Sequence, residues 1–253
     1  MDISFNLSKD EAERYRRQLM LAADYGFDQQ KLKKASVFIA GAGGLGSPAA
    51  YYLAAAGVGR LIIDDCDSVE LSNLNRQILH SSGRIGMSKS ESAAETLRSL
   101  NPEIVIDVRT DRIDGGYEEI LPVADGADLV IDCLDNIEAR WSLSDFASES
   151  GIPIVHGGIN SLAGQICFIQ PPGTACLGCI FPEKLPLEGP IPVIGAIAGV
   201  IGSMQALEAV KYLCGFGELL RNRLMIIDGF SWETAVIDLE KNPACPVCGA
   251  GRR

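Results

Sequence analysis

The sequence predicts an α/β fold, a Rossmann-like and mostly parallel sheet with helices on both faces. Three observations predict it: short β-branched runs alternate with helical stretches, a glycine-rich turn follows the first run, and the runs are apolar along nearly their whole length. Parallel strands buried on both faces give such continuous apolar runs, and the helices between them make the crossovers. With 253 residues, 47% of them hydrophobic, the chain is long enough for one large domain of this kind.

The first half is expected to contain four strands and two clear helices. The strands are SVFIA (36–40), RLIIDD (60–65), EIVIDV (103–108) and DLVIDC (128–133). The helices are expected to begin at Ser47 and Ser88. Pro48 supports the first start, because proline is tolerated where a helix N–H would have no partner. Gly57 is expected to end that helix.

After Pro153 the pattern changes to strands joined by tighter turns, which are expected to extend the sheet with antiparallel pairs. These strands are IPIVHGG (152–158), GQICFIQ (164–170), RLMIIDG (223–229) and TAVIDLE (234–240). One strong helix is expected, at 202–215, ended by glycine. Segment 171–192 is rich in proline and glycine and is expected to be a loop, and loops of that length are often functional.

Composition argues against several classes of partner. The net charge of −11 would repel nucleic acid and anionic membranes at long range. The polar N-terminus lacks the apolar region of a signal peptide, and the longest apolar stretches, near Ala196 and Leu224, are too short for a transmembrane helix. A cytoplasmic location is therefore expected. There, eight cysteines indicate metal ligands, reactive thiols or buried side chains rather than a disulfide framework.

The turn GAGGLGS, after the first strand, satisfies the G-x-G-x-x-G pattern of nucleotide-binding loops with the glycines Gly41, Gly43, Gly44 and Gly46. Because it follows a strand and opens a helix, its N–H groups and the helix dipole can face a phosphate. Asp64 and Asp65 end the next strand, where a carboxylate can hydrogen-bond a ribose hydroxyl. Tight strand–turn–helix packing alone would also select glycines, but we expect a nucleotide site.

Residues around the turn favour ATP over a dinucleotide. Arg76 follows the second strand, and Lys89 lies in the first turn of a helix, where a cation is unfavourable unless an anion compensates it. ATP carries about four negative charges, more than the bridging pyrophosphate of a dinucleotide. Cationic side chains and a divalent metal therefore stabilise bound ATP more than a bound dinucleotide. Asp135, just past the fourth strand, is the candidate metal ligand. The alternatives are a solvated helix face for Lys89 and a helix cap for Asp135.

Four cysteines form two C-x-x-C pairs, Cys176 with Cys179 and Cys245 with Cys248. Four thiolates complete a tetrahedral zinc site, so we expect a structural zinc ion that holds the C-terminal tail onto the 171–192 loop. A redox C-x-x-C is the alternative, although two such pairs would then be coincidental. The remaining cysteines, Cys66, Cys133, Cys167 and Cys214, have apolar neighbours and are expected to be buried.

These motifs resemble those of the HesA/MoeB/ThiF adenylyltransferases, the bacterial relatives of ubiquitin-activating enzymes. The resemblance covers nearly the whole chain and lies in RYRRQ, GAGGLGS, DDCDSVELSNLNRQ, GMSKSE, DCLDN, CLGC, GSMQALEAVK and CPVC, in this order. It implies ATP-dependent adenylation of the C-terminal glycine carboxylate of a small ubiquitin-like sulfur carrier ending in Gly-Gly. The pathways implied are molybdopterin or thiamine biosynthesis, and the expected state is a homodimer.

The resemblance also implies roles for individual residues. Arg76 and Lys89 would bind the phosphates, Asp135 would hold magnesium, and Arg17 would reach into the partner subunit's site of a homodimer. The implied ATP-binding residues are Gly41, Gly43, Gly44, Gly46, Asp65, Asp67, Ser72, Asn73, Asn75, Arg76, Gln77, Lys89, Leu134, Asp135 and Asn136. The chain, 1–253, is then a single adenylation domain with an N-terminal helical arm (1–35), a nucleotide-binding half (36–150) and a carrier-binding half with the zinc site (151–253).

The sequence departs from some family members because segment 181–203 contains no cysteine. A loop thioester or persulfide is therefore not expected, and neither is a rhodanese-like domain, so another protein would supply the sulfur. Three alternatives stay open: adenylation of another acid such as a peptide carboxylate or a tRNA threonylcarbamoyl group, a nicotinamide-dependent oxidoreductase, and a non-catalytic partner subunit. An oxidoreductase would need an acid–base group, and His80 and His156 are the available histidines.

Overall fold

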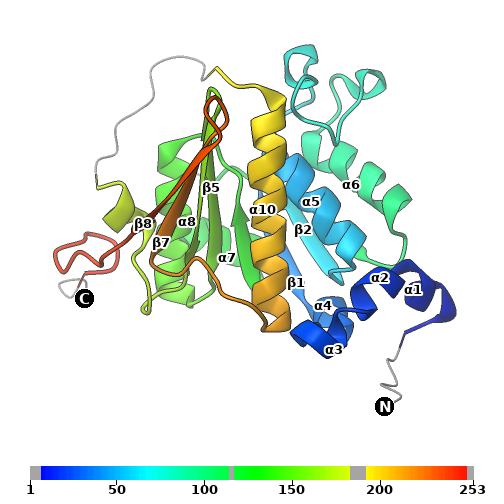
Figure 1. Cartoon of the computed structure of the whole chain (residues 1–253). Helices are drawn as coiled ribbons and strands as arrows, with labels where there is room; N and C mark the ends of the chain where they lie inside the picture. The colour runs from blue at the N-terminus through cyan, green and yellow to red at the C-terminus, as the bar shows by residue number, and fades with distance from the viewer. Residues whose placement is uncertain (1–6, 114–116, 183–191, 250–253) are drawn as a thin grey trace.

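The computed structural model describes residues 7–113, 117–182 and 192–249, and these contain one eight-stranded sheet of order β3-β2-β1-β4-β5-β6-β7-β8 (Figure 1). Strands β1 to β5 pair in parallel, and β6, β7 and β8 are added by antiparallel pairing. The strands are β1 Ser36–Ala40, β2 Arg60–Asp64, β3 Val105–Arg109, β4 Leu129–Asp132, β5 Ile154–Asn160, β6 Ala163–Ile169, β7 Arg223–Asp228 and β8 Glu233–Asp238. The expected mixed sheet is confirmed.

Helices cover both faces of this sheet (Figure 1). The α-helices are α1 Lys9–Arg14, α2 Arg16–Leu19, α3 Ala22–Tyr25, α4 Gln29–Lys34, α5 Gly46–Ala56, α6 Lys89–Leu100, α7 Tyr117–Val123, α8 Ile137–Ser150, α9 Leu177–Ile180 and α10 Gly195–Cys214, and the 3₁₀ turns are Leu71–Asn73 and Ser82–Arg84. Side chains alternate along β1: Val37 and Ile39 pack with α5, α6 and α10, while Phe38 and Ala40 pack with α7 and α8. The sheet thus separates two apolar cores.

The N-terminal arm consists of α1 to α4 and packs at the end of the sheet where the parallel strands begin (Figure 1). Arg14 Nη1 donates to the carbonyl of Leu100, at the end of α6. Gln18 and Gln29 both donate from Nε2 to the Ala56 carbonyl, at the end of α5, over 3.0 and 2.8 Å. The last carbonyls of a helix have no hydrogen-bond partners within the helix. These bonds satisfy such carbonyls, so the arm caps the C-terminal ends of α5 and α6.

Helix boundaries differ from the sequence expectation in ways that packing explains. Helix α5 begins at Gly46 with Leu45 at its N-cap, so Ser47 is not the cap; its buried hydroxyl instead accepts the Leu79 N–H. Helix α10 begins at Gly195, seven residues before the expected 202. A Cβ at Gly195 would overlap the Asn75 carbonyl oxygen, which is why glycine occurs in this helical turn.

Helices α7, α8 and α9 were not expected individually, and α9 lies inside the segment that was expected to be a loop throughout. Residues 183–191 of that segment lie outside the described residues. Both glycine stops are confirmed: Gly57 and Gly215 take left-handed conformations after α5 and α10, with φ of 83° and 76°. Among the described residues, no helix combines the length and apolarity needed to cross a bilayer.

Candidate functional site

The glycine turn lies where the strand order reverses. From β1, the chain continues to β2 and β3 on one side of the sheet and later to β4 and β5 on the other, so the loops at the carboxyl ends of β1 and β4 diverge. Gly41 has φ of 96°, and a Cβ there would lie 2.9 Å from the Cys133 carbonyl oxygen. A Cβ at Gly46 would overlap the Gly41 carbonyl oxygen. The fold itself therefore requires these two glycines.

The two middle glycines are not required by internal packing. A Cβ at Gly43 would have Gln77 Nε2 as its nearest neighbour at 3.4 Å, and one at Gly44 would be 3.5 Å from the Ala198 Cβ. Neither N–H donates to an acceptor within residues 7–113, 117–182 and 192–249. Two unpaired backbone donors beside a helix start suit an anionic ligand.

This difference predicts that one alanine substitution affects mainly stability and another mainly nucleotide binding. Gly46→Ala is expected to destabilise the fold by about 3 kcal/mol or more, because backbone must move to admit the methyl group. Gly44→Ala is expected to leave unfolding within about 1 kcal/mol of wild type but to weaken nucleotide binding, measured by chemical denaturation and by calorimetric titration with ATP. Gly83→Ala, where a Cβ would meet nothing within 4 Å, is the control. Normal nucleotide binding by Gly44→Ala would contradict this account of the turn.

Asp65, just beyond β2, holds the turn in place. Its Oδ2 accepts the Ala42 N–H at 2.8 Å and its Oδ1 accepts the Asp67 N–H at 3.0 Å. Burial raises the pKa of this carboxyl above its usual value, while Lys89 and the two N–H groups act to lower it. A carboxylate can accept about four hydrogen bonds, so capacity for further donors remains.

Lys89 is the first residue of α6 and its side chain is only 9% exposed. Its Nζ lies 2.7 Å from Asp67 Oδ2 and 3.8 Å from Asp65 Oδ1. The position of Lys89 in the sequence predicts a phosphate as the compensating anion, and in the structure the Asp67 and Asp65 carboxylates lie beside its charge. The Asp67 side chain is 67% exposed, so it can turn away if a ligand anion takes its place.

The segment after β2 lies against the turn. Arg76 packs beside Gly44, and its Nη1 donates to the Ser72 carbonyl and to Asn75 Oδ1, each over 3.0 Å. Asn73 is buried, and its Oδ1 accepts the Glu70 N–H. Gln77 is also buried, and its Oε1 has no hydrogen-bond partner among the described residues. Such an unpaired acceptor is unfavourable in a folded protein unless a ligand or water donates to it.

Asp135 and Asn136 follow β4 on the other side of the turn, after Leu134. Asn136 is the N-cap of α8, and its Oδ1 accepts the Ala139 N–H at 2.7 Å. The alternative that Asp135 is itself the helix cap is therefore wrong. Its carboxylate is exposed at the carboxyl edge of the sheet, where ligands of open α/β sheets bind.

Arg17, in contrast, lies far from the glycine turn of its own chain. The neighbouring Gln18 contacts Ala56 at the last residue of α5, whereas the turn precedes the first. That helix has 11 residues and is about 16 Å long at 1.5 Å per residue. The exposed Arg17 side chain is thus not brought to the nucleotide residues within one chain.

The four cysteines of the two C-x-x-C pairs form one cluster, with all four sulfurs within 4.8 Å of one another. The Sγ–Sγ distances are 3.8 Å for Cys176–Cys179, 3.6 Å for Cys176–Cys245 and 3.5 Å for Cys179–Cys248. A tetrahedral site with Zn–S bonds of about 2.3 Å needs sulfurs about 3.8 Å apart. The cluster joins the region of α9 to the C-terminal tail, as the spacing predicts.

Backbone donors support anionic sulfur in this cluster. The Asn242 N–H donates to Cys179 Sγ and the Val247 N–H to Cys245 Sγ, each at 3.4 Å. Burial acts to raise the pKa of the Cys179 thiol, but the Asn242 N–H and other hydrogen bonds outweigh it and lower that pKa to about 7. Burial instead raises the pKa of the Cys176 thiol, and that of Cys248 to about 11, so the support for anionic sulfur is specific to Cys179. Val247 itself is buried in the same apolar core as Leu177.

Three of the other four cysteines, Cys133, Cys167 and Cys214, are buried as expected, but Cys66 is exposed. The expectation for Cys66 was wrong because β2 ends at Asp64, so this residue lies in the loop beyond the sheet.

The structure also contains a buried polar cluster that the sequence analysis did not single out. His156 Nδ1 donates to Asp132 Oδ2 at 2.7 Å, and neither side chain is exposed. Burial opposes ionisation of Asp132, but Arg140 and His156 lower its pKa below the usual value; burial also lowers the pKa of His156, which is therefore neutral. The sequence feature that could have indicated this cluster is Asp132, at the end of an otherwise apolar run, with Arg140 eight residues later.

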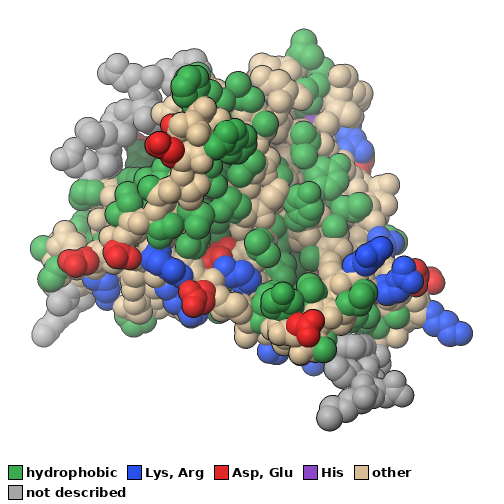
Figure 2. All heavy atoms as spheres, in the orientation of Figure 1, with side chains coloured by type: hydrophobic (Ala, Val, Ile, Leu, Met, Phe, Trp, Pro, Cys, Tyr) green, Lys and Arg blue, Asp and Glu red, His purple; other side chains and the backbone are tan. Residues whose placement is uncertain are grey.

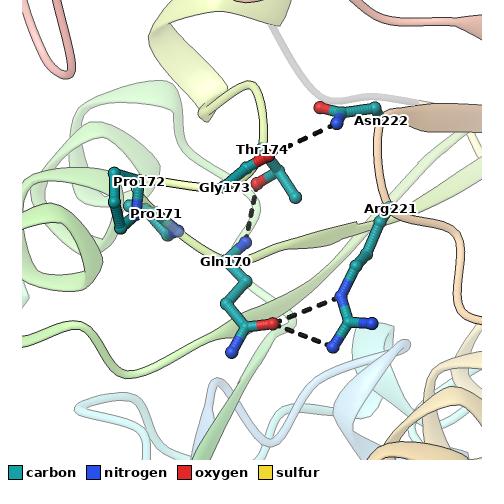
Figure 3. A pocket seen from close by; sticks show the side chains of 7 residues that line it. All are labelled: Gln170, Pro171, Pro172, Gly173, Thr174, Arg221 and Asn222. Atoms are coloured by element: carbon teal, nitrogen blue, oxygen red, sulfur yellow. Dashed lines mark hydrogen bonds between the residues drawn. The ribbon is translucent and has the colours of Figure 1, made fainter.

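A separate surface pocket of about 370 Å³ lies at the end of β6 (Figure 3). It is lined by Gln170, Pro171, Pro172, Gly173, Thr174, Arg221 and Asn222, and Arg221 donates to Gln170 Oε1 across it. Because β6 runs antiparallel to β5, this pocket is at the opposite edge of the sheet from the glycine turn. It is not part of the nucleotide region.

Comparisons with known proteins agree with this arrangement. A model of the ThiF family matches residues 15–247. The chain is 45% identical over 251 residues to "Adenylyltransferase and sulfurtransferase MOCS3" of Drosophila yakuba, across 96% of this chain and 55% of that protein. It is 38% identical over 255 residues to "SAMP-activating enzyme E1" of Haloferax volcanii, across 98% of this chain and 93% of that protein.

The chain therefore spans about half the length of the Drosophila relative and nearly all of the Haloferax relative. Among solved structures, E. coli MccB with succinimide has the same fold, with a TM-score of 0.85 and 24% identity over 96% of this chain and 75% of that chain. The family match, the two relatives and the arrangement of the glycine turn lead to one conclusion: this chain belongs to the ThiF family.

Proposed function

We propose that this protein adenylates the C-terminal glycine carboxylate of a small ubiquitin-like sulfur carrier with ATP, for molybdopterin or thiamine biosynthesis. The observation that carries the proposal is the glycine turn with its unpaired Gly43 and Gly44 N–H groups. Arg76 packs beside Gly44, and Lys89 lies 3.8 Å from Asp65, the carboxylate that accepts the Ala42 N–H of the turn. The names of the relatives, an adenylyltransferase and a SAMP-activating enzyme, support the same reaction class.

The reaction needs charge neutralisation more than proton transfer. A carboxylate oxygen of the carrier attacks the α-phosphorus of ATP, the bond from that phosphorus to the bridging oxygen breaks, and pyrophosphate leaves with the electron pair. The product is an acyl-adenylate. The nucleophile is already ionised, so no general base is required, and catalysis consists of holding two anions together and stabilising the pyrophosphate.

The described residues suit these tasks. In this proposal the glycine turn and Arg76 hold the phosphates, while Lys89 exchanges Asp67 for a phosphate oxygen. Asp65 accepts a hydrogen bond from the ribose with its remaining lone pairs, and the unpaired Gln77 Oε1 accepts a hydrogen bond from the nucleotide. Ser72, Asn73, Asn75, Leu134 and Asn136 complete the proposed ATP site.

Magnesium fits the acidic side chain at the edge of β4. The Asp135 carboxylate is exposed and does not cap the helix, and hard oxygen ligands of this kind suit Mg²⁺ bound together with nucleotide phosphates. When bound, the ion would supply positive charge to the departing pyrophosphate. Asp135 would hold it, with Asn136 alongside.

Zinc fits the four-cysteine cluster, which has the sulfur spacing and the N–H donors of a closed, structural site. We propose that it fixes the carrier-binding half of the domain and takes no part in the chemistry. The eight cysteines are all free thiols, which suits a reducing compartment such as the cytoplasm.

We further propose a homodimer in which Arg17 reaches the nucleotide of the partner. Hydrophobic side chains spread over the face formed by α10 and the β7–β8 hairpin (Figure 2). Exposed members of this set include Leu207, Phe230, Trp232 and Val236. A large exposed apolar face usually marks an interface, and a second copy could bring its arm to the turn that Arg17 cannot reach within its own chain.

Hydride transfer by a nicotinamide enzyme is less well supported. His80 is buried, with Nδ1 3.0 Å from Ser92 Oγ and Nε2 3.0 Å from the Ala42 carbonyl oxygen. His156 is fully buried between Asp132 and Gln165. Neither ring faces solvent, so neither can serve a substrate as an acid–base group without a rearrangement.

The test is ATP–pyrophosphate exchange with magnesium and purified carriers that end in Gly-Gly. Exchange that depends on the carrier and is lost when its last two glycines are deleted is expected. Exchange with a peptide carboxylate or a threonylcarbamoyl-tRNA instead would assign another acid as substrate. Binding of NADH together with no exchange for any acid would overturn the proposal.

A further inference from the structure

Arg140, on the first turns of α8, is placed to hold the segment that carries Asp135. Its Nε donates to the Leu134 carbonyl oxygen at 3.1 Å, and its Nη2 donates both to the same oxygen and to the Gly157 carbonyl oxygen, the latter at 2.9 Å. The side chain is 16% exposed. One guanidinium thus ties the loop after β4 to the neighbouring strand β5.

The N–H of Leu134 is held as well as its carbonyl. The Leu134 N–H donates to Asp132 Oδ1 at 3.2 Å, and the same oxygen lies 3.6 Å from Arg140 Nε. Leu134 is therefore fixed at its N–H by Asp132 and at its C=O by Arg140. The next residue along the chain is Asp135, so the position of its Cα follows from this clamp.

The clamp is itself fixed by buried groups. Asp132 Oδ2 accepts from His156 Nδ1, and His156 Nε2 lies 3.2 Å from Gln165 Nε2, which can only donate. His156 Nε2 therefore accepts, and the ring proton resides on Nδ1. Gln205 of α10 donates to the main-chain carbonyls of Asp132 and Val155, at 2.8 and 3.1 Å. Both oxygens of the Asp132 carboxylate thus have partners, and Gln205 holds the main chain of the same residue.

We propose that Arg140 is a positioning residue for the proposed magnesium ligand Asp135, acting through the Leu134 peptide. The inference rests on the proposed function for the identity of the metal, but the positioning itself depends only on the contacts above. Residues that orient a metal ligand without touching the metal typically affect metal affinity by about 10- to 100-fold. Lysine keeps the charge next to Asp132 but lacks the planar fork that reaches two carbonyls at once.

The test compares Arg140→Lys and Arg140→Gln with Asp135→Asn and wild type. The control is Arg98→Lys, because Arg98 Nη2 likewise donates to a main-chain carbonyl, that of Ile106 at 2.8 Å, but on α6 away from Asp135. Binding of Mn²⁺ in the presence of ATP is followed by electron paramagnetic resonance. Hydrogen–deuterium exchange of the peptide covering 133–139 reports order in the loop, and thermal unfolding reports the fold.

Arg140→Lys is expected to weaken Mn²⁺ binding by about tenfold and Arg140→Gln by more, with faster amide exchange in 133–139 and without a matching loss of folded protein. Arg98→Lys is expected to change neither. Mn²⁺ affinity and amide exchange at wild-type levels in a folded Arg140→Lys or Arg140→Gln protein would overturn the proposal. The two proposals can fail separately. If the protein adenylates no carrier but Mn²⁺ binding still depends on Arg140, the positioning role stands and the proposed function is wrong. If adenylation is normal and Mn²⁺ binding does not depend on Arg140, only the positioning role is wrong.

Discussion

Replacing Lys89 with alanine is expected to lower ATP–pyrophosphate exchange by about 100-fold or more. Removal of one preorganised group that stabilises transition-state charge typically costs about 10²- to 10³-fold in rate. The loss here should fall within this range, because Lys89 is nearly buried and its charge would act in a region with little water.

The same substitution is expected to leave stability almost unchanged. A cation at the first position of a helix is unfavourable for the helix dipole, and alanine is the best helix former. The lost pair with Asp67 contributes little, because that carboxylate is largely exposed, and the nearly buried Asp65 keeps the Ala42 and Asp67 N–H donors. Lys89→Ala should therefore separate activity from folding, with exchange kinetics and denaturant unfolding as the two measurements.

Lys211→Ala is the matched control, because Lys211 also pairs with a carboxylate, Glu208, but near the far end of α10. It is expected to retain the exchange rate of the wild type per folded molecule. If Lys89→Ala exchanges normally, the proposed contact between Lys89 and phosphate is wrong, and the Lys89–Asp67 pair is structural.

Loss of one zinc ligand is expected to lower stability strongly. Cys248→Ser should abolish bound zinc and lower the free energy of unfolding by about 3 kcal/mol or more. That is a modest part of the ~10–16 kcal/mol with which zinc-finger peptides bind the metal. The physical reason is that the cluster joins residues 176–179 to residues 245–248, so without the metal the tail is held mainly by buried Val247 and its neighbours.

Zinc content by atomic emission and unfolding in denaturant measure this effect. Cys66→Ser, at an exposed cysteine outside the cluster, should retain one zinc per chain and wild-type stability. A strong chelator added to the wild type should reproduce the Cys248→Ser unfolding curve. Freshly purified wild-type protein without zinc would contradict the assignment of the metal, and disulfide formation within the cluster would then favour the redox alternative.

Much of the nucleotide-binding region could be predicted from the sequence, because its features are local. The turn at 41–46 requires glycines that a strand and a helix place on either side, and a Cβ at Gly41 or Gly46 would clash with backbone. Parallel strands must also bring their carboxyl ends to one edge, so Asp65 and Asp135 could be placed there before any contact was known. The spacing of the C-x-x-C pairs likewise predicted their cluster.

The start of α10 could not be predicted, because glycine is a poor helix former and three of the first eight residues of α10 are glycines. Gly195 and Gly202 are required because the helix packs closely on the segment containing Asn75 and on the residues around Leu45, whereas a Cβ at Gly199 would meet nothing within 4 Å. The partner of Lys89 was missed for a similar reason: helix propensity shows an uncompensated cation, and only the fold brings Asp67 to 2.7 Å from it.

The sequence by itself determined the order of the strands along the chain, the position of the glycine turn and the two C-x-x-C pairs, since each follows from residue type and spacing along a short stretch of chain. Only the tertiary structure decided that Asn136 rather than Asp135 caps α8 and that Cys66 is exposed. It also decided that Asp132 and Arg140 hold Leu134, and that His156 holds Asp132. These contacts join residues from β4, α8 and β5, and their distances depend on how strands pair and helices pack. No local pattern contains that information.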